Sequence, residues 1–342
     1  MLPARLIALV LLGAACVPAR AQGMLPPPVQ QALAAARIPQ KNVAVVLEEA
    51  GASRSLIRVN ASAPMNPASV MKLLTAYAAL ELLGPTYRWK TSVYLEGALS
   101  DGVLQGNLVL KGGGDPRLNL ESFWLLLRAL RARGLREIRG DLVLDRSAFE
   151  HNGAKPGDFD GEAFRPYNVL PDALLVNFRS LRFLFLPVPE TGAVRVAVEP
   201  RPPALEVVNA LALGEGPCPE GRAFRDLLQP SFEPERQRAI FAGRYPASCG
   251  EKDLHVALLE PDDQVAGVMR QLWAEIGGSW TGAVRAGSAP AGAAPFHVQE
   301  SAPLAELVRD GLKLSNNVMA RHVFLALGGD ADGPSAGAPA ST

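Results

Sequence analysis

The sequence of 342 residues has no surplus of either charge, because 34 lysines and arginines balance 34 aspartates and glutamates. A nucleic-acid-binding protein needs a basic surplus to neutralise phosphates, so the composition argues against nucleic acid as a partner. Histidine is scarce too: four are present, they are scattered, and none belongs to a His-Glu-x-x-His motif. We therefore expect no metal site and no cofactor.

The sequence also lacks an apolar run long enough to span a membrane, which takes about 20 residues. The run near the N-terminus covers only residues 6–15. Arg5 precedes it and Ala19-Arg20-Ala21 follows it, a pattern typical of a secretory signal cut after Ala21. Cys16 leaves a lipoprotein signal open, although the residues before it lack the usual leucine. We expect residues 1–21 to be a signal peptide and the mature chain to be secreted, soluble and without a transmembrane segment.

Cysteine is nearly absent, with three residues in the chain. Cys16 would leave with the signal peptide, so Cys218 and Cys249 would remain in an oxidising compartment. Both lie in turn-rich segments, and neither has a histidine at metal-ligand spacing. We expect a structural disulfide between them, and its loop of about 30 residues would stabilise the fold by roughly 3–4 kcal/mol.

Glycine and proline are abundant, with 32 and 29 residues, and favour a loop-rich architecture. The patterns predict a hairpin over 42–49 and 53–59, then a helix over 69–83. Residues 90–252 read as short strands and turns, interrupted by one helix over 120–133. The strands expected in this region cover residues 103–111, 137–144, 181–187 and 193–199. The expected later elements are a strand over 255–259, a helix over 262–276, a strand-like segment over 281–285, and helices over 304–312 and 317–327. The Gly/Ala/Pro/Ser-rich residues 328–342 read as a disordered tail.

Ser69-Val70-Met71-Lys72 is the strongest chemical signal. A hydroxyl and an amine three residues apart in the first turn of a helix lie on the same face. Serine is a weak nucleophile that needs a base, and lysine can serve if burial and the helix N-terminus lower its pKa. The alternative is an ordinary serine cap followed by a solvated lysine, but the strongly apolar helix directly after a hairpin favours the catalytic interpretation.

Ser315-Asn316-Asn317 lies between the two last predicted helices. Such a Ser-x-Asn turn can place a hydroxyl and an amide at the mouth of a cleft, to relay a proton and hold a peptide carbonyl. Taken alone, the same residues are equally typical of a helix N-cap. The motif gains its value from the combination with Ser69 and Lys72.

Five further segments carry a resemblance to a known family. They are Pro-Ala-Ser-Val-Met-Lys-Leu-Leu-Thr (67–75), Gly-Pro-Thr-Tyr-Arg-Trp-Lys-Thr (84–91), Leu-Lys-Gly-Gly-Gly-Asp-Pro (110–116), Gly-Asp-Leu-Val-Leu-Asp-Arg-Ser (140–147) and Gly-Arg-Tyr-Pro-Ala-Ser-Cys-Gly (243–250). Together they resemble the serine D-Ala-D-Ala carboxypeptidase/endopeptidases of the class C low-molecular-mass penicillin-binding proteins. The resemblance covers residues from about 25 to 327.

The resemblance implies an α/β fold, in which a transpeptidase/β-lactamase-like domain is interrupted by a large β-rich insertion. We expect the first domain to comprise residues 22–90 and 253–327, and the insertion to comprise residues 91–252. It also implies a periplasmic protein that acts on peptidoglycan stem peptides and is inhibited covalently by β-lactam antibiotics.

The resemblance assigns roles to six residues. Ser69 would attack the carbonyl between two D-alanines, Lys72 would take its proton, and Ser315 would pass a proton to the leaving group. Asn317 would hold the substrate backbone. Asp160 and Tyr167 would reach the cleft from the insertion and meet the amino group of the substrate's diamino acid. Glu162 is a possible substitute for Asp160, and an ordinary polar loop is an equally good interpretation of this segment.

The third element of the family, Lys-Thr-Gly after the Ser-x-Asn turn, does not occur in this sequence. Lys90-Thr91-Ser92 is the nearest string but lies upstream, so we treat it as a decoy. We expect this chain to end before that segment and to be inactive by itself. A serine β-lactamase and a non-catalytic peptidoglycan-binding remnant are the alternatives to a peptidase.

Overall fold

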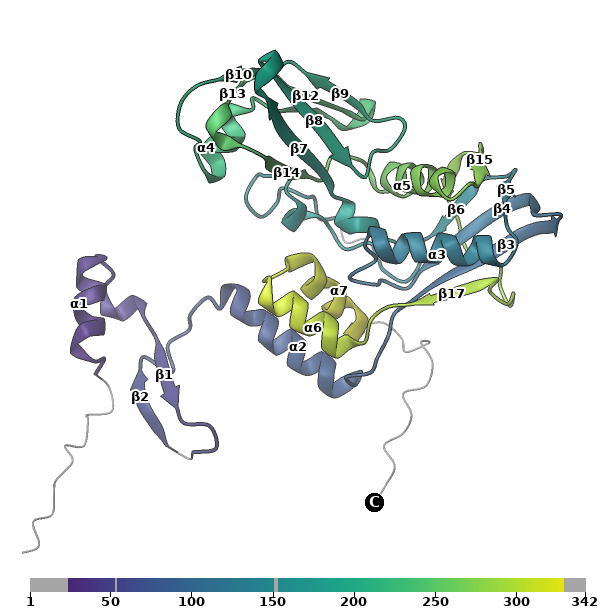
Figure 1. The fold of residues 1–342 in the computed structure, drawn as a ribbon. Helices are drawn as coiled ribbons and strands as arrows, with labels where there is room; N and C mark the ends of the chain where they lie inside the picture. Colours follow the sequence, from purple (N-terminus) through teal and green to yellow (C-terminus); the bar gives the residue numbers. More distant parts are fainter. Residues whose placement is uncertain (1–23, 53, 151–152, 329–342) are drawn as a thin grey trace, which may run out of the picture. The chain divides into compact units, whose positions relative to one another are not determined.

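The structure is a computed structural model that describes residues 24–52, 54–150 and 153–328 (Figure 1). The chain divides into two compact units, Met1–Ala68 and Ser69–Thr342. The predicted signal peptide and all of the predicted tail after Gly328 lie outside the described residues. Within these ranges, no helix has both the length and the apolar character needed to cross a membrane.

The first unit contains the predicted hairpin. Strands β1 (Val45–Glu48) and β2 (Ser55–Val59) pair antiparallel, which confirms the hairpin. Gly51 lies in the connecting turn with a φ of 80°, a conformation that glycine adopts without strain. The helix α1 (Pro27–Ala35) and the 3-10 turn η1 (Gln40–Asn42) precede the hairpin.

A seven-stranded sheet organises the second unit. Its long strands β3 (Lys90–Ser100) and β4 (Val103–Gly112) form an antiparallel hairpin along their whole length. The other strands are β5 (Glu137–Ile138), β6 (Leu142–Asp145), β15 (Ser279–Trp280), β16 (Val284–Ala286) and β17 (His297–Glu300). β5 and β6 pair with successive parts of β4, and β15 and β16 extend them outward. β17 pairs antiparallel with β3 at the other side of the hairpin.

Two details of this sheet differ from the sequence prediction. The strand expected over 137–144 is two strands, separated where Gly140 passes so close to β4 that a Cβ would lie 2.4 Å from the carbonyl oxygen of Gly106. β17 was not predicted, because its three half-buried residues and one exposed residue give no clear alternation. The domain boundary at residues 252/253 stays a prediction, and strands from both sides of it share this sheet.

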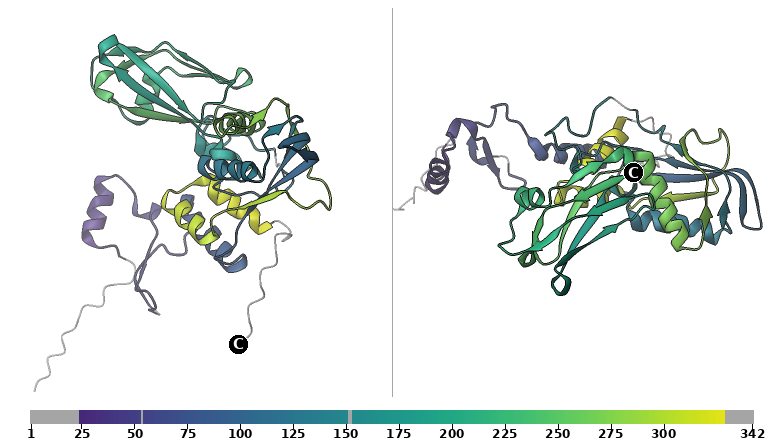
Figure 2. Two further views of the ribbon diagram at one scale, coloured as in Figure 1. Left: turned by 45° about the vertical axis from the view of Figure 1, so that its right-hand side comes forward. Right: turned by 90° about the horizontal axis from the view of Figure 1, so that it is seen from above.

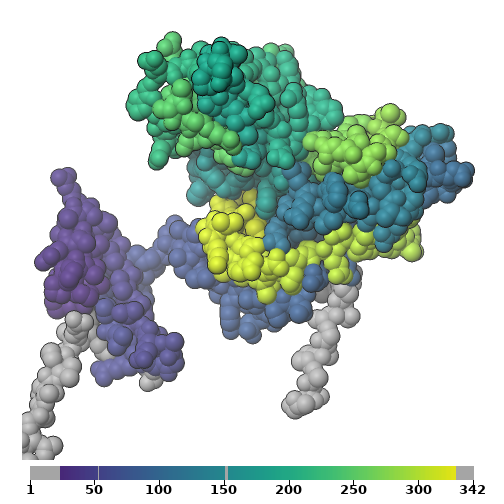
Figure 3. Space-filling view, in the orientation of Figure 1, coloured from purple at the N-terminus to yellow at the C-terminus, as the bar shows by residue number. Residues whose placement is uncertain are grey.

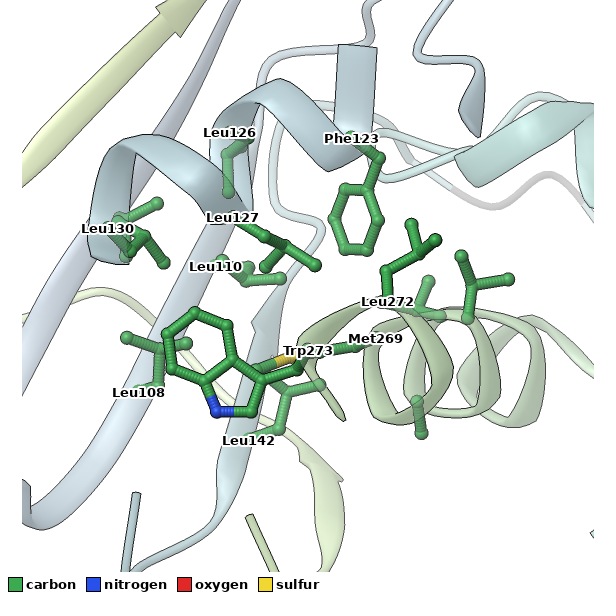
Figure 4. Packing of buried hydrophobic residues seen from close by; sticks show 14 of the residues in the cluster. Leu108, Leu110, Phe123, Leu126, Leu127, Leu130, Leu142, Met269, Leu272 and Trp273 are labelled. Carbon is green, nitrogen blue, oxygen red and sulfur yellow. The ribbon is translucent and has the colours of Figure 1, made fainter. Parts of the chain in front are cut away.

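Two amphipathic helices cover the sheet and form its main core with it. The helix α3 (Leu120–Ala132) begins at Asn119, whose side chain accepts a hydrogen bond from the Ser122 N–H at 2.9 Å. The second helix is α5 (Pro261–Glu275). In Figure 4 the labelled leucines of α3 (Leu126, Leu127 and Leu130) point toward Leu108 and Leu110 of β4 and toward Trp273 of α5. The periodicity predicted both helices.

A β-rich lobe follows in the chain, coloured teal to green in the space-filling view (Figure 3). One sheet has the order β13-β10-β8-β7-β14 and the other β11-β12-β9. The strands are β7 (Leu181–Val188), β8 (Ala193–Glu199), β9 (Glu206–Asn209), β10 (Ala212–Gly214), β11 (Ser231–Glu233), β12 (Arg238–Phe241), β13 (Arg244–Pro246) and β14 (Lys252–Val256), with helix α4 (Gly221–Leu227) between β10 and β11. β14 thus begins and ends three residues before the predicted strand.

Cys218 and Cys249 form a disulfide in this lobe, with Cα atoms 4.8 Å apart. Four short 3-10 turns lie in or next to this part of the chain: η4 (Val176–Arg179), η5 (Pro189–Thr191), η6 (Pro234–Arg236) and η7 (Ala247–Cys249).

Three helices form a separate layer, in which they lie side by side (Figure 2). They are α2 (Met71–Leu82), α6 (Leu304–Lys313) and α7 (Asn317–Gly328). Ala79 of α2 packs against Leu307 of α6 and Val323 of α7 in a small core. The opposite face of α2 leaves Leu73, Leu74 and Tyr77 more than half exposed, although their spacing is that of a buried helix face.

The loop after β4 fastens this layer to the sheet. His322 of α7 is fully buried, and its Nδ1 lies 3.0 Å from the carbonyl oxygen of Gly114. The Asp172 N–H donates to His322 Nε2 at 3.4 Å, so the ring is neutral with its proton on Nδ1. Arg117 forms ion pairs with Glu306 at 2.7 Å and with Asp310 at 2.5 Å, both on α6.

His322 gives the fold a defined pH dependence. Burial lowers its pKa from 6.5 to about 4. Below pH 6.5 this histidine is protonated in the unfolded chain but stays neutral in the folded chain. The free energy of unfolding therefore falls as the pH drops from 6.5 toward 4. The loss should reach up to about 3 kcal/mol. We expect urea unfolding of the wild type to show this loss and His322→Gln to lack it. Parallel curves for the two proteins from pH 7 to 4 would contradict the prediction.

Candidate active site

Ser69 and Lys72 lie at the start of α2. Ser69 belongs to the 3-10 turn η2 (Ala68–Val70), and Lys72 is the second residue of the helix that follows. Lys72 Nζ donates a hydrogen bond to Ser69 Oγ at 2.8 Å. The helix begins two residues later than expected, and the predicted contact between hydroxyl and amine is formed.

The Ser-x-Asn motif forms the tight turn between α6 and α7. Ser315 has a φ of 49°, the left-handed conformation that costs a residue with a side chain roughly 1–2 kcal/mol. Asn316 accepts a hydrogen bond from the Met319 N–H at 3.0 Å and so caps α7. The capping interpretation of this motif therefore applies to Asn316, while the side chains of Ser315 and Asn317 stay available.

The amine of Lys72 joins the two motifs. Besides Ser69, its Nζ contacts Ser315 Oγ at 3.2 Å and Asn317 Oδ1 at 2.7 Å. Ser69 and Ser315 are exposed, whereas Lys72 and Asn317 are half-buried. Four of the six residues singled out in the sequence thus meet at one amine.

The pKa of Lys72 is lowered from its ordinary value of 10.5, first by burial and then by the positive charge of Arg321. Arg321 lies one turn after Asn317 on α7. A lower pKa enlarges the fraction of neutral amine near pH 7, and only the neutral amine can accept a proton.

Asp160 and Tyr167 form a second polar group. Tyr167 Oη donates to Asp160 Oδ2 at 2.8 Å, and the buried Asn168 donates from Nδ2 to Asp160 Oδ1 at 2.6 Å. Hydrogen bonds from the Glu162 N–H, Tyr167 and Asn168 lower the pKa of Asp160, so this carboxylate is ionised at neutral pH. Tyr167 is 37% exposed.

Apolar contacts bring this second group close to α7. Tyr167 and Asn168 lie in η3 (Pro166–Asn168), which packs against α7. Val169, directly after η3, clusters with Val318 of α7, the neighbour of Asn317. In the described part of the chain, no direct hydrogen bond links Asp160 or Tyr167 to the group around Lys72. Glu162, the possible substitute for Asp160, forms an ion pair with Arg225 at 3.3 Å.

Three residues escaped the sequence analysis: Asn168, Arg321 and His322. Their spacing gives no motif, and their contacts depend on burial and on segments distant in sequence. The decoy Lys90-Thr91-Ser92 is part of β3, where Thr91 is buried within the sheet. Among residues 24–52, 54–150 and 153–328, no cluster of His, Cys, Asp or Glu side chains is arranged to hold a metal ion.

An α/β chain with a Ser-x-x-Lys turn set against a Ser-x-Asn turn is characteristic of the penicillin-binding serine enzymes. Residues 27–341 match the model of the D-Ala-D-Ala carboxypeptidase 3 (S13) family, and the chain belongs to this family.

Two curated proteins are similar over about a third of the chain. It is 34% identical over 108 residues to the D-alanyl-D-alanine carboxypeptidase DacB of Haemophilus influenzae, covering 32% of this chain and 22% of that protein. It is 36% identical over 106 residues to a D-alanyl-D-alanine carboxypeptidase of Actinomadura sp. (strain R39), covering 31% of this chain and 20% of that protein. The matched segments thus span about a fifth of each relative.

Solved structures share the fold. The crystal structure of penicillin binding protein 4 (dacB) from Haemophilus influenzae matches with a TM-score of 0.66 and 23% identity, over 83% of this chain and 62% of that one. The same protein complexed with a novel β-lactam matches with a TM-score of 0.58 and 21% identity, over 82% of this chain and 59% of that one.

Removing the charge of Arg321 should raise the pKa of Lys72, because a neighbouring cation disfavours the protonated amine. We expect Arg321→Ala to shift the Lys72 titration to higher pH in an NMR titration of isotope-labelled lysine. Arg195→Ala, which removes an exposed arginine from β8 in the lobe, should leave it unchanged. Equal titrations of Lys72 in all three proteins would contradict the role given to Arg321.

Proposed function

We propose that this protein is a periplasmic D-Ala-D-Ala carboxypeptidase and DD-endopeptidase, which cleaves peptidoglycan stem peptides through an acyl-enzyme on Ser69. The observation that carries the proposal is the amine of Lys72, held by hydrogen bonds between Ser69, Ser315 and Asn317. Membership of the S13 family supports the type of reaction.

The first chemical step moves a proton from Ser69 to Lys72. A neutral amine has two N–H groups and one lone pair. In this neutral form Ser315 Oγ and Asn317 Oδ1 accept the two N–H groups, and the 2.8 Å contact with Ser69 is reversed, so that the hydroxyl of Ser69 donates to the lone pair. As Ser69 Oγ attacks the carbonyl between the two D-alanines, its proton passes to Lys72, and the amine becomes an ammonium.

The second step releases the terminal D-alanine. Ser315 Oγ lies 3.2 Å from Lys72 Nζ, within reach to pass the proton on to the departing amine. The peptide then remains as an ester on Ser69, and a water molecule hydrolyses it. A cross-link between two stems presents a similar bond, which is the basis for the endopeptidase activity.

Asn317 and Asp160 suit two parts of the substrate. Because Lys72 engages Asn317 Oδ1, the Nδ2 of the same amide remains to donate to a substrate backbone carbonyl. The ionised Asp160, oriented by Tyr167 and Asn168, suits an ammonium group such as the side-chain amine of a diamino acid.

The proposal predicts covalent labelling of Ser69. The full-length protein incubated with a labelled penicillin should carry the label on Ser69, as found by peptide mass spectrometry, because the strained lactam amide takes the place of the D-Ala-D-Ala bond. It should also release D-alanine from a peptide that ends in D-Ala-D-Ala. Ser69→Ala should lose both activities, and Ser248→Ala, an exposed serine of the lobe, should keep both.

Covalent labelling of the Ser69→Ala protein by penicillin would contradict the assignment of Ser69 as the nucleophile. Hydrolysis of a chromogenic cephalosporin at many cycles per second, without D-alanine release, would identify a β-lactamase instead. Penicillin binding without acylation or peptide cleavage would point to a non-catalytic wall-binding protein.

A further inference from the structure

A cavity of about 300 Å³ lies apart from the Ser69 group, between residues 161–165, α4 and β14. Helix α4 and strand β14 belong to the β-rich lobe and are both labelled in Figure 1. Phe164, Phe232 and Leu254 give the cavity an apolar lining, and charged side chains surround it. The Ala257 N–H donates to the carbonyl oxygen of Phe164 at 2.9 Å, so the wall made by residues 161–165 is tied to the end of β14.

The charges around this cavity leave cations available. Arg225 is paired with Glu162 at 3.3 Å. Arg222 is only 3.8 Å from Asp226, and both side chains are more than two-thirds exposed, so this pair is weak. Arg165 forms no ion pair within 4 Å among the described residues and its buried Nε has no hydrogen-bond partner there, although its charge lies near enough to Asp160 to lower the pKa of that carboxyl. Two arginines therefore remain able to bind an anion.

Arg165 also connects the cavity with the second polar group. Its guanidinium carbon lies 5.3 Å from the ring centroid of Tyr167. Residues 161–165 thus form the cavity wall within the same loop that presents Asp160 and Tyr167. A ligand bound in the cavity would therefore contact the same loop that carries Asp160 and Tyr167, the side chains proposed to hold the substrate's ammonium group.

We propose that this cavity is a second substrate subsite, which binds a carboxylate-bearing segment of a peptidoglycan peptide through Arg165 and Arg222. This inference rests on the proposed function. The combination of separated cations with an apolar lining suits a peptide acid, whose methyl and methylene groups are buried while its carboxylate is paired. A small hydrated anion such as phosphate would leave the apolar surface uncovered. A cross-linked substrate supplies such acids beyond the cleaved bond.

Kinetics with two substrates test the subsite. Arg222→Glu should raise the KM for a cross-linked muropeptide dimer about tenfold, the worth of one charge-assisted contact. It should leave kcat/KM for a diamino acid–D-Ala–D-Ala tripeptide and the rate of penicillin acylation at wild-type values. Arg236→Glu, an equally exposed charge reversal in the same lobe, should change neither substrate. Equal KM values for the dimer in the two variants, or equal losses on both substrates, would overturn the subsite.

A binding measurement separates this inference from catalysis. Calorimetric titration of the Ser69→Ala protein with the dipeptide L-Ala-γ-D-Glu should give binding that is lost in the additional variant Arg222→Glu and kept in Arg236→Glu. Inorganic phosphate at the same concentration should not displace the dipeptide. Absence of dipeptide binding, or its displacement by phosphate, would overturn the subsite while leaving acylation of Ser69 untouched. Failure of wild-type acylation with intact dipeptide binding would instead overturn the proposed function alone.

Discussion

The proposed chemistry depends on one contact: the amine of Lys72 meets residues 243 and 245 positions later in the chain. A serine and a lysine three residues apart at the start of a helix are common in proteins, and by themselves they have no catalytic role. In the mechanism proposed above, the turn at Ser315 supplies acceptors for the two N–H groups of a neutral amine and so leaves its lone pair for Ser69. Arg321 adds a positive charge to the same surroundings and, together with burial, lowers the pKa of Lys72.

The rest of the second unit holds that contact in place. α7 carries Asn317 at its start and the buried His322 further along, and His322 fixes the helix to Gly114 and Asp172 beside the seven-stranded sheet. Arg117 from the same loop pairs with two carboxylates of α6. The left-handed Ser315, strained by itself, is thus held between two anchored helices, a setting in which such backbone strain persists.

The sequence predicted elements with strong local signals and missed those that depend on distant partners. The helices α2, α3, α5, α6 and α7 follow from periodicity, and Ser69 and Lys72 from their spacing. β17 escaped, since its four residues are a strand only through their pairing with β3, about 200 residues away in the chain. Asn168 and His322 escaped for a similar reason, because burial gives an ordinary asparagine and histidine their roles. Leu73, Leu74 and Tyr77 show the opposite limit of sequence prediction. Periodicity identifies them as an apolar helix face, but it does not show whether other residues cover that face, and in the structure they are exposed.

The proposed role of Lys72 as the base is tested most directly by the rate at which penicillin acylates Ser69 in a Lys72→Arg variant of the full-length protein. Arginine keeps the positive charge and the hydrogen-bond donors, but it cannot lose a proton in a protein and so cannot act as the base. If Lys72 takes the proton of Ser69, the acylation rate should fall by roughly 10²–10⁴-fold, the usual contribution of general base catalysis, while the thermal unfolding temperature stays near that of the wild type. An acylation rate within about threefold of the wild type, with the same fold stability, would contradict the central role of this amine.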